Sequence, residues 1–135
     1  MAAVLELLTE PILNYEGAVL SHRQAGVVAI WNAPHEQPNH ALLALAAARA
    51  AMAAASAGRR AFGLRPRGGV VTGDVVVANF GSRARKAYAP IGSLVTSSDI
   101  ACSGAPEGVL RISRATLAEA GEAMAFEGDY AEERF

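Results

Sequence analysis

The feature that most constrains the fold is an alanine-rich stretch near the middle of the chain. It extends from His40 to Ala57 without a glycine or a proline, and most of its residues are strong helix formers. Asn39 offers a side chain that can cap the first turn, and Gly58 provides a stop. The stretch therefore predicts a long helix, whose small alanine side chains would let it lie close against a sheet.

Extended, valine-rich runs surround this predicted helix. Before it, Ala18 to Arg23 and Val27 to Trp31 are separated by three residues, which predicts a β-hairpin. After it, the region from Leu64 to Asn79 contains valine runs interrupted by glycine, as expected of buried strand with a bend or a bulge.

Local patterns predict further elements towards both ends of the chain. The first segment has the spacing of an amphipathic helix that bends or ends near Pro11 and closes at Gly17. The remaining predicted elements are strands over 88–91 and 109–112, helices over 94–101 and 114–124 with Ser113 as the cap of the second, and a last strand from Phe126. The length suits one domain over residues 1–135, and the alternation of strands and helices predicts an α+β sandwich with helices on one or both faces.

Composition narrows the classes of protein that this chain can belong to. The formal net charge is −1, so the whole molecule has no attraction for nucleic acid, and we expect no nucleic-acid partner. The alanine-rich stretch is interrupted by Arg49 and is only weakly hydrophobic, so we expect no membrane insertion. Cys102 is the only cysteine, which rules out an intrachain disulfide and suits a reducing cytoplasm. We therefore expect a cytoplasmic protein in which Cys102 is an unreactive thiol.

Charge is distributed unevenly along the chain. The basic residues of the middle are Arg59, Arg60, Arg65, Arg67, Arg83, Arg85 and Lys86. The acidic residues of the last stretch are Glu119, Glu122, Glu127, Asp129, Glu132 and Glu133. We favour two separately solvated surfaces over a basic hairpin that meets an acidic tail, because exposed ion pairs contribute only about 0 to 1 kcal/mol.

Three segments carry a pattern that spans most of the chain. They are VVAIWNAP from Val27 to Pro34, PNHA from Pro38 to Ala41, and VTGDVVVANFGS from Val71 to Ser82. Residues Arg85, Tyr88, Ile91, Gly92 and Val95 continue the pattern. In order and spacing, these segments together resemble the catalytic domain of class III adenylate and guanylate cyclases.

The resemblance implies a ferredoxin-like α/β sandwich of the nucleotidyl cyclase type, which pairs head to tail with its nucleotide sites at the interface. In that family two aspartates hold two divalent metals on the triphosphate, so that a ribose hydroxyl is activated. A lysine and an aspartate or threonine read the base, an asparagine orients the ribose, and an arginine stabilises the transition state.

This chain departs from the family pattern at each functional position that can be aligned. The second metal aspartate falls at Ala25, the base-reading lysine at Ser21, its acidic or threonine partner at Ala89, the ribose-orienting asparagine at Thr96, the catalytic arginine at Ile100, and a phosphate-binding lysine at Glu127. A slip of one residue would not restore them. No Asp or Glu lies between Glu16 and Glu36, and nothing basic lies between Lys86 and Arg111.

The first strand and first helix of the family pattern are missing, so the expected fold is N-terminally truncated. That strand is central to the family sheet, and its loss would leave unpaired backbone on two neighbours. Three resolutions are open: the remaining strands close up, a partner chain supplies the strand, or the sequence is a fragment of a longer protein.

These departures predict a degenerate cyclase homology domain that acts as a dimerisation and regulatory module in cyclic-nucleotide signalling, without catalysis, cofactor or metal. Its partner would be a second copy or another cyclase domain, giving a homodimer or a heterodimer. The core or the interface would contain Trp31, Phe62, Phe80 and Tyr88. One alternative is an active adenylate or guanylate cyclase, using Mg²⁺ or Mn²⁺, that upstream residues or a partner subunit complete. A second is a nucleotide-binding sensor without turnover.

Other kinds of site are disfavoured by the sequence. His22, His35 and His40 with Glu36 could suggest a metal site, but they fall on unrelated predicted elements. Ser97 or Ser98 with Asp99 has no Gly-x-Ser-x-Gly elbow for nucleophilic catalysis. The arginines of the middle lack the interleaved aromatic residues of an RNA-binding surface.

Overall fold

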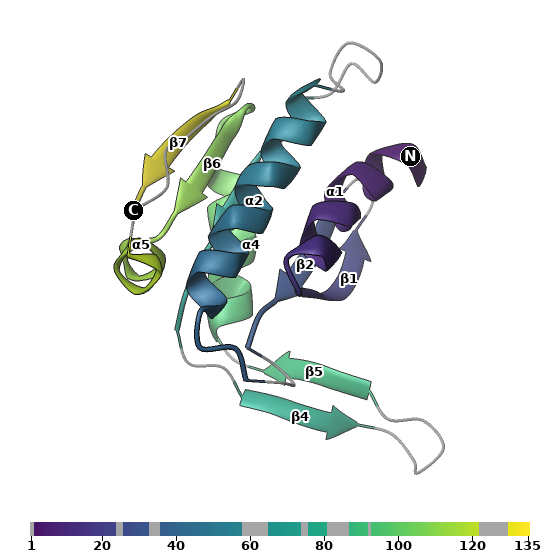
Figure 1. Cartoon of the computed structure of the whole chain (residues 1–135), viewed down its shortest axis with the longest axis vertical. Coiled ribbons are helices and arrows are strands. Elements are labelled where there is room, and N and C mark those ends of the chain that lie inside the picture. Colours follow the sequence, from purple (N-terminus) through teal and green to yellow (C-terminus); the bar gives the residue numbers. More distant parts are fainter. Residues whose placement is uncertain are drawn as a thin grey trace.

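The computed structural model describes residues 2–23, 26–32, 36–57, 65–73, 76–80, 87–91, 93–121 and 130–135. The helices are α1 (Ala2–Asn14), α2 (His40–Ala57), α4 (Ser93–Gly104) and α5 (Arg114–Ala120). The strands are β1 (Ala18–Arg23), β2 (Gly26–Ile30), β3 (Gly68–Val70), β4 (Val76–Phe80), β5 (Ala87–Ile91), β6 (Val109–Ile112) and β7 (Ala131–Arg134). Figure 1 shows their arrangement around α2.

The described strands form three separate sheets. β1 and β2 make an antiparallel hairpin with an irregularity between Val19 and Ser21. β3, β6 and β7 form a parallel sheet with β6 in the centre. β4 and β5 pair antiparallel from Val76 opposite Ile91 to Phe80 opposite Ala87, and Figure 1 shows this hairpin extending away from the helices.

Helices cover both faces of β3, and the two glycines of that strand explain how closely. A Cβ on Gly69 would lie 2.7 Å from the Ala101 side chain of α4. A Cβ on Gly68 would lie 3.0 Å from Leu110 Cδ1 and 3.6 Å from Met52 Sδ of α2. β3 is therefore packed between α2 and α4, and its contact with α4 at Gly69 is closer than a side chain would allow.

The hydrophobic core lies between α2 and the parallel sheet. Its buried members are Leu45 and Met52 of α2, Leu110 and Ile112 of β6, Leu117 of α5, and Tyr130. The strand β6 has alternate residues buried, because successive side chains of a strand point to opposite faces of the sheet. The small residues Ala46 and Ala47 let α2 approach its neighbours closely, as the alanine-rich sequence predicts.

Most predicted elements are confirmed, and the boundaries of three are corrected. Residues 40–57 form a helix, and residues 18–30 contain the hairpin. The first helix runs through Pro11 to Asn14, and the Gly17 N–H then bonds the Ile12 carbonyl. The last helix ends at Ala120 rather than Met124, because Gly121 takes the left-handed conformation with φ of 79°. The helix expected over 94–101 spans Ser93–Gly104.

Ser113 caps α5, as predicted from the sequence. Its side-chain oxygen accepts a hydrogen bond from the Thr116 N–H at 3.2 Å. The Thr116 hydroxyl lies 2.8 Å from Ser113 Oγ and 2.7 Å from the hydroxyl of Thr72, which follows β3. This chain of hydroxyl groups ties the start of α5 to the end of the β3 segment, and it satisfies the fully buried Thr116.

Three of the four large aromatic residues expected in the core or the interface are among the described residues. Trp31 follows β2 and is half-buried; its indole N–H donates to the Tyr15 carbonyl at 2.8 Å, and its ring covers the backbone of Gly17. Phe80 and Tyr88 lie in the hairpin that extends away from the core, and Phe62 lies outside the described residues. Tyr130, which the sequence analysis did not single out, is the aromatic residue of the core cluster.

The sheet topology bears on the expectation that the strands beside the first strand of the family pattern close up. Among the described residues, β2 and β3 belong to different sheets and are not hydrogen-bonded to each other, so these two strands have not closed up. In Figure 1, α2 lies between the β1–β2 hairpin and the β3–β6–β7 sheet.

α2 is, among the described residues, the helix long and apolar enough to cross a membrane by length and composition. The core helix of a soluble protein meets the same criteria. Leu45, Ala47 and Met52 of α2 are buried inside the fold, so core packing accounts for its apolar character.

Candidate functional site

Helix α4 carries two of the positions to which the family resemblance assigns a function. Thr96 and Ile100 are one helical turn apart and therefore share a face of α4. Both are exposed, and Ile100 is 64% exposed although it is a large apolar residue. This face offers a hydroxyl group and an alkyl group, and neither carries a charge that could stabilise a phosphate.

Two further positions lie on strands, and two lie outside the described residues. Ser21 is in β1 opposite Val28, and Ala89 is in β5 opposite Ala78. Ala25 and Glu127 lie outside the described residues. The four described positions thus stand on three elements, β1, β5 and α4, which belong to different parts of the fold.

Cys102 lies near the end of α4 and has the properties of an unreactive thiol. It is half-buried, and its Sγ lies 3.7 Å from the Arg67 carbonyl, to which it donates. Burial raises the pKa of Cys102, while nearby Arg67 lowers it and Asp99 raises it. The sulfur is therefore held in the protonated form, which is a poor nucleophile and a poor metal ligand.

Comparisons with known proteins point to one family. Adenylate cyclase 1 of Rhizobium meliloti (strain 1021) is 31% identical over 101 residues, which is 70% of this chain and 15% of that protein. The crystal structure of the guanylyl cyclase Cya2 matches with a TM-score of 0.71 and 27% identity, over 89% of this chain and 66% of Cya2. The chain is a class III nucleotidyl cyclase-like domain.

A second solved structure supports the fold of the cyclase-like domain. The adenylyl cyclase CyaB from P. aeruginosa matches with a TM-score of 0.73 and 24% identity, over 92% of this chain and 68% of CyaB. The domain spans about 15% of the length of the R. meliloti enzyme and about two thirds of the two solved chains. No protein-family model matches the sequence.

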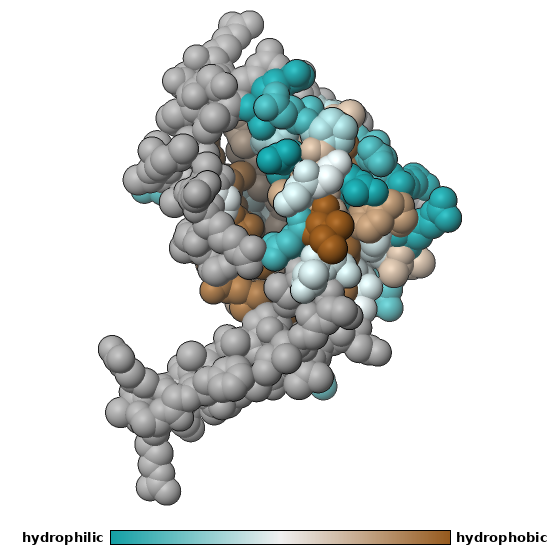
Figure 2. All heavy atoms as spheres, turned by 180° about the vertical axis from the view of Figure 1, so that it is seen from behind, coloured by the Kyte–Doolittle hydropathy of each residue, from teal (hydrophilic) through white to brown (hydrophobic). Residues whose placement is uncertain are grey.

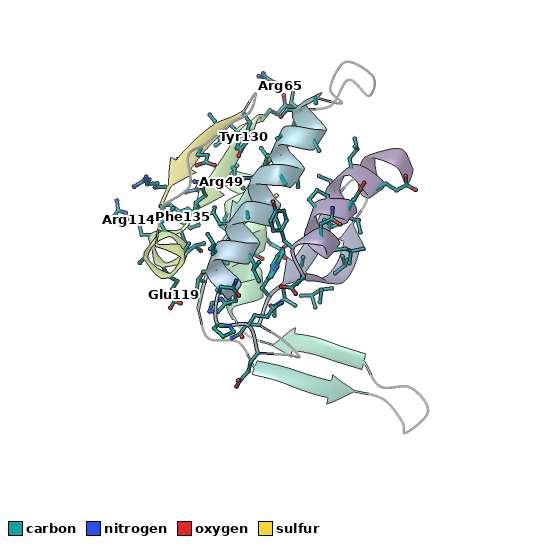
Figure 3. The ribbon with its side chains drawn as sticks, viewed as in Figure 1. Arg49, Arg65, Arg114, Glu119, Tyr130 and Phe135 are labelled. Atoms are coloured by element: carbon teal, nitrogen blue, oxygen red, sulfur yellow. The ribbon has the colours of Figure 1, made fainter. Side chains whose placement is uncertain are left out.

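Among the described residues, a polar cluster of the cyclase-like domain lies between α2 and β7. Arg49 donates from Nε to Glu132 Oε2 at 2.7 Å and from Nη2 to Glu132 Oε1 at 2.9 Å. The Tyr130 hydroxyl donates to the same carboxylate at 3.3 Å, and Figure 3 shows Tyr130 and Arg49 beside each other. The side chains of Arg49 and Glu132 are only 12% and 16% exposed.

This cluster is structural rather than catalytic. Burial, followed by the charge and hydrogen bond of Glu132, raises the pKa of Tyr130 well above its usual value, so that the phenol stays protonated. Every member of the cluster is directed at another member, which holds β7 against α2. Sequence analysis treated Arg49 only as an interruption of the apolar stretch. The signal that it missed is the arginine itself. A charged side chain within a predicted core helix needs an oppositely charged partner, so its presence indicates an ion pair.

Three acidic residues of the last stretch, Glu119, Glu132 and Glu133, have basic partners in the fold, while Glu122, Glu127 and Asp129 lie outside the described residues. Glu132 pairs with Arg49, Glu133 lies 3.5 Å from Arg111, and Glu119 lies 3.6 Å from His40. Arg111 also stacks on Phe135, with its guanidinium carbon 4.5 Å from the ring centroid. Neither Arg49 nor Arg111 belongs to the basic stretch that was considered as a partner.

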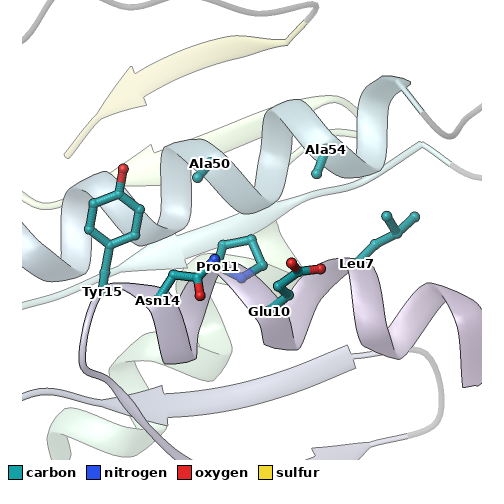
Figure 4. Close-up of a pocket in the computed structure, with 7 residues that line it drawn as sticks. All are labelled: Leu7, Glu10, Pro11, Asn14, Tyr15, Ala50 and Ala54. Atoms are coloured by element: carbon teal, nitrogen blue, oxygen red, sulfur yellow. The ribbon is translucent and has the colours of Figure 1, made fainter.

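A shallow groove between α1 and α2 has the wrong chemistry for a nucleotide. Figure 4 shows its lining, which consists of Leu7, Glu10, Pro11, Asn14 and Tyr15 from the α1 side and Ala50 and Ala54 from α2. Its volume is about 340 Å³. The charged group that faces this groove is the carboxylate of Glu10, which would repel a triphosphate.

Within the part of the chain that the structure describes, no three His, Cys, Asp or Glu side chains gather where they could hold a metal ion. His40, one of the histidines considered from the sequence, begins α2 and faces Glu119.

Proposed function

We propose that this cyclase-like domain is a catalytically inactive partner-binding module, which pairs with a second cyclase domain and regulates cyclic-nucleotide signalling in the cytoplasm. The observation that carries the proposal is the outer face of α4. At the position where the resemblance places the catalytic arginine, the chain presents Ile100, which is 64% exposed.

An exposed isoleucine at this position fits binding to a protein better than binding to a phosphate. A branched alkyl group cannot donate a hydrogen bond or neutralise charge, so it contributes nothing to stabilising a pentacovalent phosphorus. Buried against a partner, the same group contributes roughly 1.5 to 3 kcal/mol through removal of apolar surface from water. Thr96, on the same face, can hydrogen-bond to a partner but carries no charge.

The sequence of the β1–β2 hairpin supports the proposal, because it lacks the carboxylate that would bind a metal ion. In the sequence, Gln24 and Ala25 connect β1 to β2, and neither offers a carboxylate for a hard divalent cation. No acidic residue lies within seven positions on either side of Ala25, so the substitution cannot be compensated locally.

Association with a second domain is supported by the β4–β5 hairpin. Figure 1 shows that it extends from the fold, and its sequence is rich in valine and alanine. A hairpin of this apolar composition would gain stability from contact with a second domain, because the contact would remove apolar surface from water. The partner is a second copy of this chain or another cyclase domain.

The test is an activity assay joined to a measurement of assembly. The purified chain is incubated with ATP or GTP and with Mg²⁺ or Mn²⁺, alone and mixed with an active adenylyl cyclase domain as the positive control. The proposal predicts no cyclic nucleotide from the chain alone, a concentration-dependent dimer in analytical ultracentrifugation, and a change in the control enzyme's rate on mixing.

Turnover by the chain alone would refute the proposal. A chain that stays monomeric at every concentration and leaves the active domain unchanged would refute the pairing role. The variant Ala50→Ser, in the groove between α1 and α2, serves as a control that should behave as the parent chain.

A further inference from the structure

The groove between α1 and α2 is shaped by small side chains. Ala50 and Ala54 of α2 are one helical turn apart, and each side chain ends at its Cβ. The space that they leave has a volume of about 340 Å³, near the lower end of the range of small-molecule sites. Figure 4 shows Leu7 and Tyr15 at its two ends. The groove is therefore large enough for a short aliphatic molecule.

Pro11 leaves a backbone acceptor on the groove side of α1. A proline inside a helix has no N–H to donate to the carbonyl four residues before it, which here is the carbonyl of Leu7. Both residues line the groove, and Figure 4 shows the Pro11 ring on the side of α1 that faces α2. In the same view the Glu10 carboxylate lies between these two residues. A carbonyl that lacks its helical hydrogen bond and a carboxylate are thus offered together.

The segment that contributes α1 is uniformly acidic. From residue 2 to residue 21 it contains Glu6, Glu10 and Glu16 and no lysine, arginine or histidine. Glu6 and Glu10 are one helical turn apart, and like charges at this spacing repel each other. A bound cation would relieve this repulsion.

The other charges near the groove also favour a cation. The carbonyl end of a helix carries a partial negative charge, and the last turn of α1 has no basic residue to offset it. The arginine of α2, Arg49, is held in an ion pair with Glu132 of β7 at 2.7 Å. The groove therefore has a negative potential that the described side chains do not neutralise.

We propose that this groove binds an aliphatic diamine. One ammonium group would lie at the Glu10 carboxylate and the Leu7 carbonyl, because an ammonium group has three donors and no acceptor. The second would lie at the ring of Tyr15, whose face attracts cations. The methylene chain between them would cover Ala50 and Ala54, and it would remove apolar surface from water.

The Tyr15 end of the groove is held in place by the backbone. The Tyr15 N–H donates to the Pro11 carbonyl at 3.1 Å, and the Tyr15 carbonyl accepts from the Trp31 indole at 2.8 Å. Asn14, which also lines the groove, adds a side-chain amide beside the ring. At about 1.5 Å per residue, Glu10 and Tyr15 are separated by about 7.5 Å along the helix axis, which suits a diamine of about five methylene groups.

The experiment is a titration of the isotope-labelled chain with 1,5-diaminopentane at low ionic strength, followed by NMR chemical shifts of the backbone amides. We expect saturable shifts at Asn14, Tyr15, Ala50 and Ala54, with a dissociation constant of about 1 mM or below. Two probes of matched length serve as controls. The uncharged 1,5-pentanediol should cause no saturable shift up to 10 mM, and pentylamine, with one ammonium group, should bind at least threefold more weakly.

Variants separate the groove from the general acidity of α1. Glu10→Gln should weaken binding at least fivefold, and its exposed position means that the fold is kept. Glu16→Gln removes the same charge from the same segment but lies outside the groove lining, so it should change binding less than twofold. Ala54→Leu fills the groove and should abolish binding.

Five results would overturn the inference. They are the absence of saturable shifts, equal weakening by Glu10→Gln and Glu16→Gln, equal binding of the diol, equal binding of pentylamine, and undiminished binding to Ala54→Leu. Binding of Nα-acetyl-lysine amide as tight as that of the diamine would refute a free diamine as the ligand, because a lysine side chain offers the same single ammonium group. Cyclase activity of the chain would refute the proposed function and leave this result unaffected.

Discussion

The ion pair between Arg49 and Glu132 gives a quantitative test of what holds β7 in place. Removing one partner of a fully buried ion pair lowers the free energy of unfolding by about 3 to 5 kcal/mol, whereas an exposed pair contributes about 0 to 1 kcal/mol to it. With side chains 12% and 16% exposed and two hydrogen bonds of 2.7 and 2.9 Å, this pair lies nearer the buried case. We expect Arg49→Met to lower the free energy of unfolding by about 2 to 3 kcal/mol, because it leaves the Glu132 charge without its partner.

The assay is equilibrium unfolding in urea, in which a slope of about 2 kcal/mol per molar turns this loss into a midpoint shift of about 1 to 1.5 M. The double variant Arg49→Met/Glu132→Met replaces the pair with apolar side chains and should recover much of the loss, giving a coupling energy above about 1 kcal/mol. Arg114→Met, at an exposed position of α5, is the control and should change stability by less than about 0.5 kcal/mol. A loss below about 1 kcal/mol for Arg49→Met, or additive single and double variants, would refute the reasoning.

Three further predictions concern other parts of the fold. The pKa of the Tyr130 phenol is raised in the folded state, so its contribution to stability is complete below about pH 10, the unfolded value, and is lost as the pH rises further. Tyr130→Phe should therefore flatten the decline of the melting temperature at high pH. An unchanged slope would contradict this prediction. Gly69→Ala would place a Cβ 2.7 Å from Ala101 and should lower the free energy of unfolding by about 1 to 3 kcal/mol or more in urea titrations, so a neutral result would mean that α4 does not pack on β3 as described. Ile100→Glu, at a 64% exposed position, should leave monomer stability within about 0.5 kcal/mol but weaken the dimer at least tenfold in ultracentrifugation; an unchanged dimer would remove Ile100 from the interface.

Much of the local structure follows from short-range rules. The helix over 40–57 consists mostly of strong helix formers, so its formation is favoured within the segment itself. The same holds for the Ser113 cap and the β1–β2 hairpin. The predicted end of α5 was wrong because the prediction gave more weight to the helix-forming residues after Gly121 than to the glycine. In the structure, Gly121 has a φ of 79°, and this left-handed conformation ends the helix.

Long-range features were harder to predict because they depend on pairs far apart in the chain. Arg49 and Glu132 are 83 residues apart, and nothing local indicates that one would bind the other. Tyr130 joins the core because β7 pairs with β6, a parallel contact that no turn signal announces. The separation of β2 from β3 likewise becomes visible only once the strand order is known.

The candidate site could be predicted as a set of aligned positions but not as a geometry. Thr96 and Ile100 were assigned through the resemblance, and the structure adds that both are exposed on one face of α4. The exposure of Ile100 is what the structure adds. A buried isoleucine would be ordinary core packing, whereas an exposed one is available to a binding partner.

Isothermal titration with ATP and with GTP, each in the presence of Mg²⁺ and of Mn²⁺, tests the central claim most directly. The claim is that the side chains of this domain do not bind a metal-bound triphosphate. We predict no heat of binding up to 1 mM nucleotide from the purified chain. Saturable binding with a micromolar dissociation constant that disappears when the divalent metal is chelated would contradict the account.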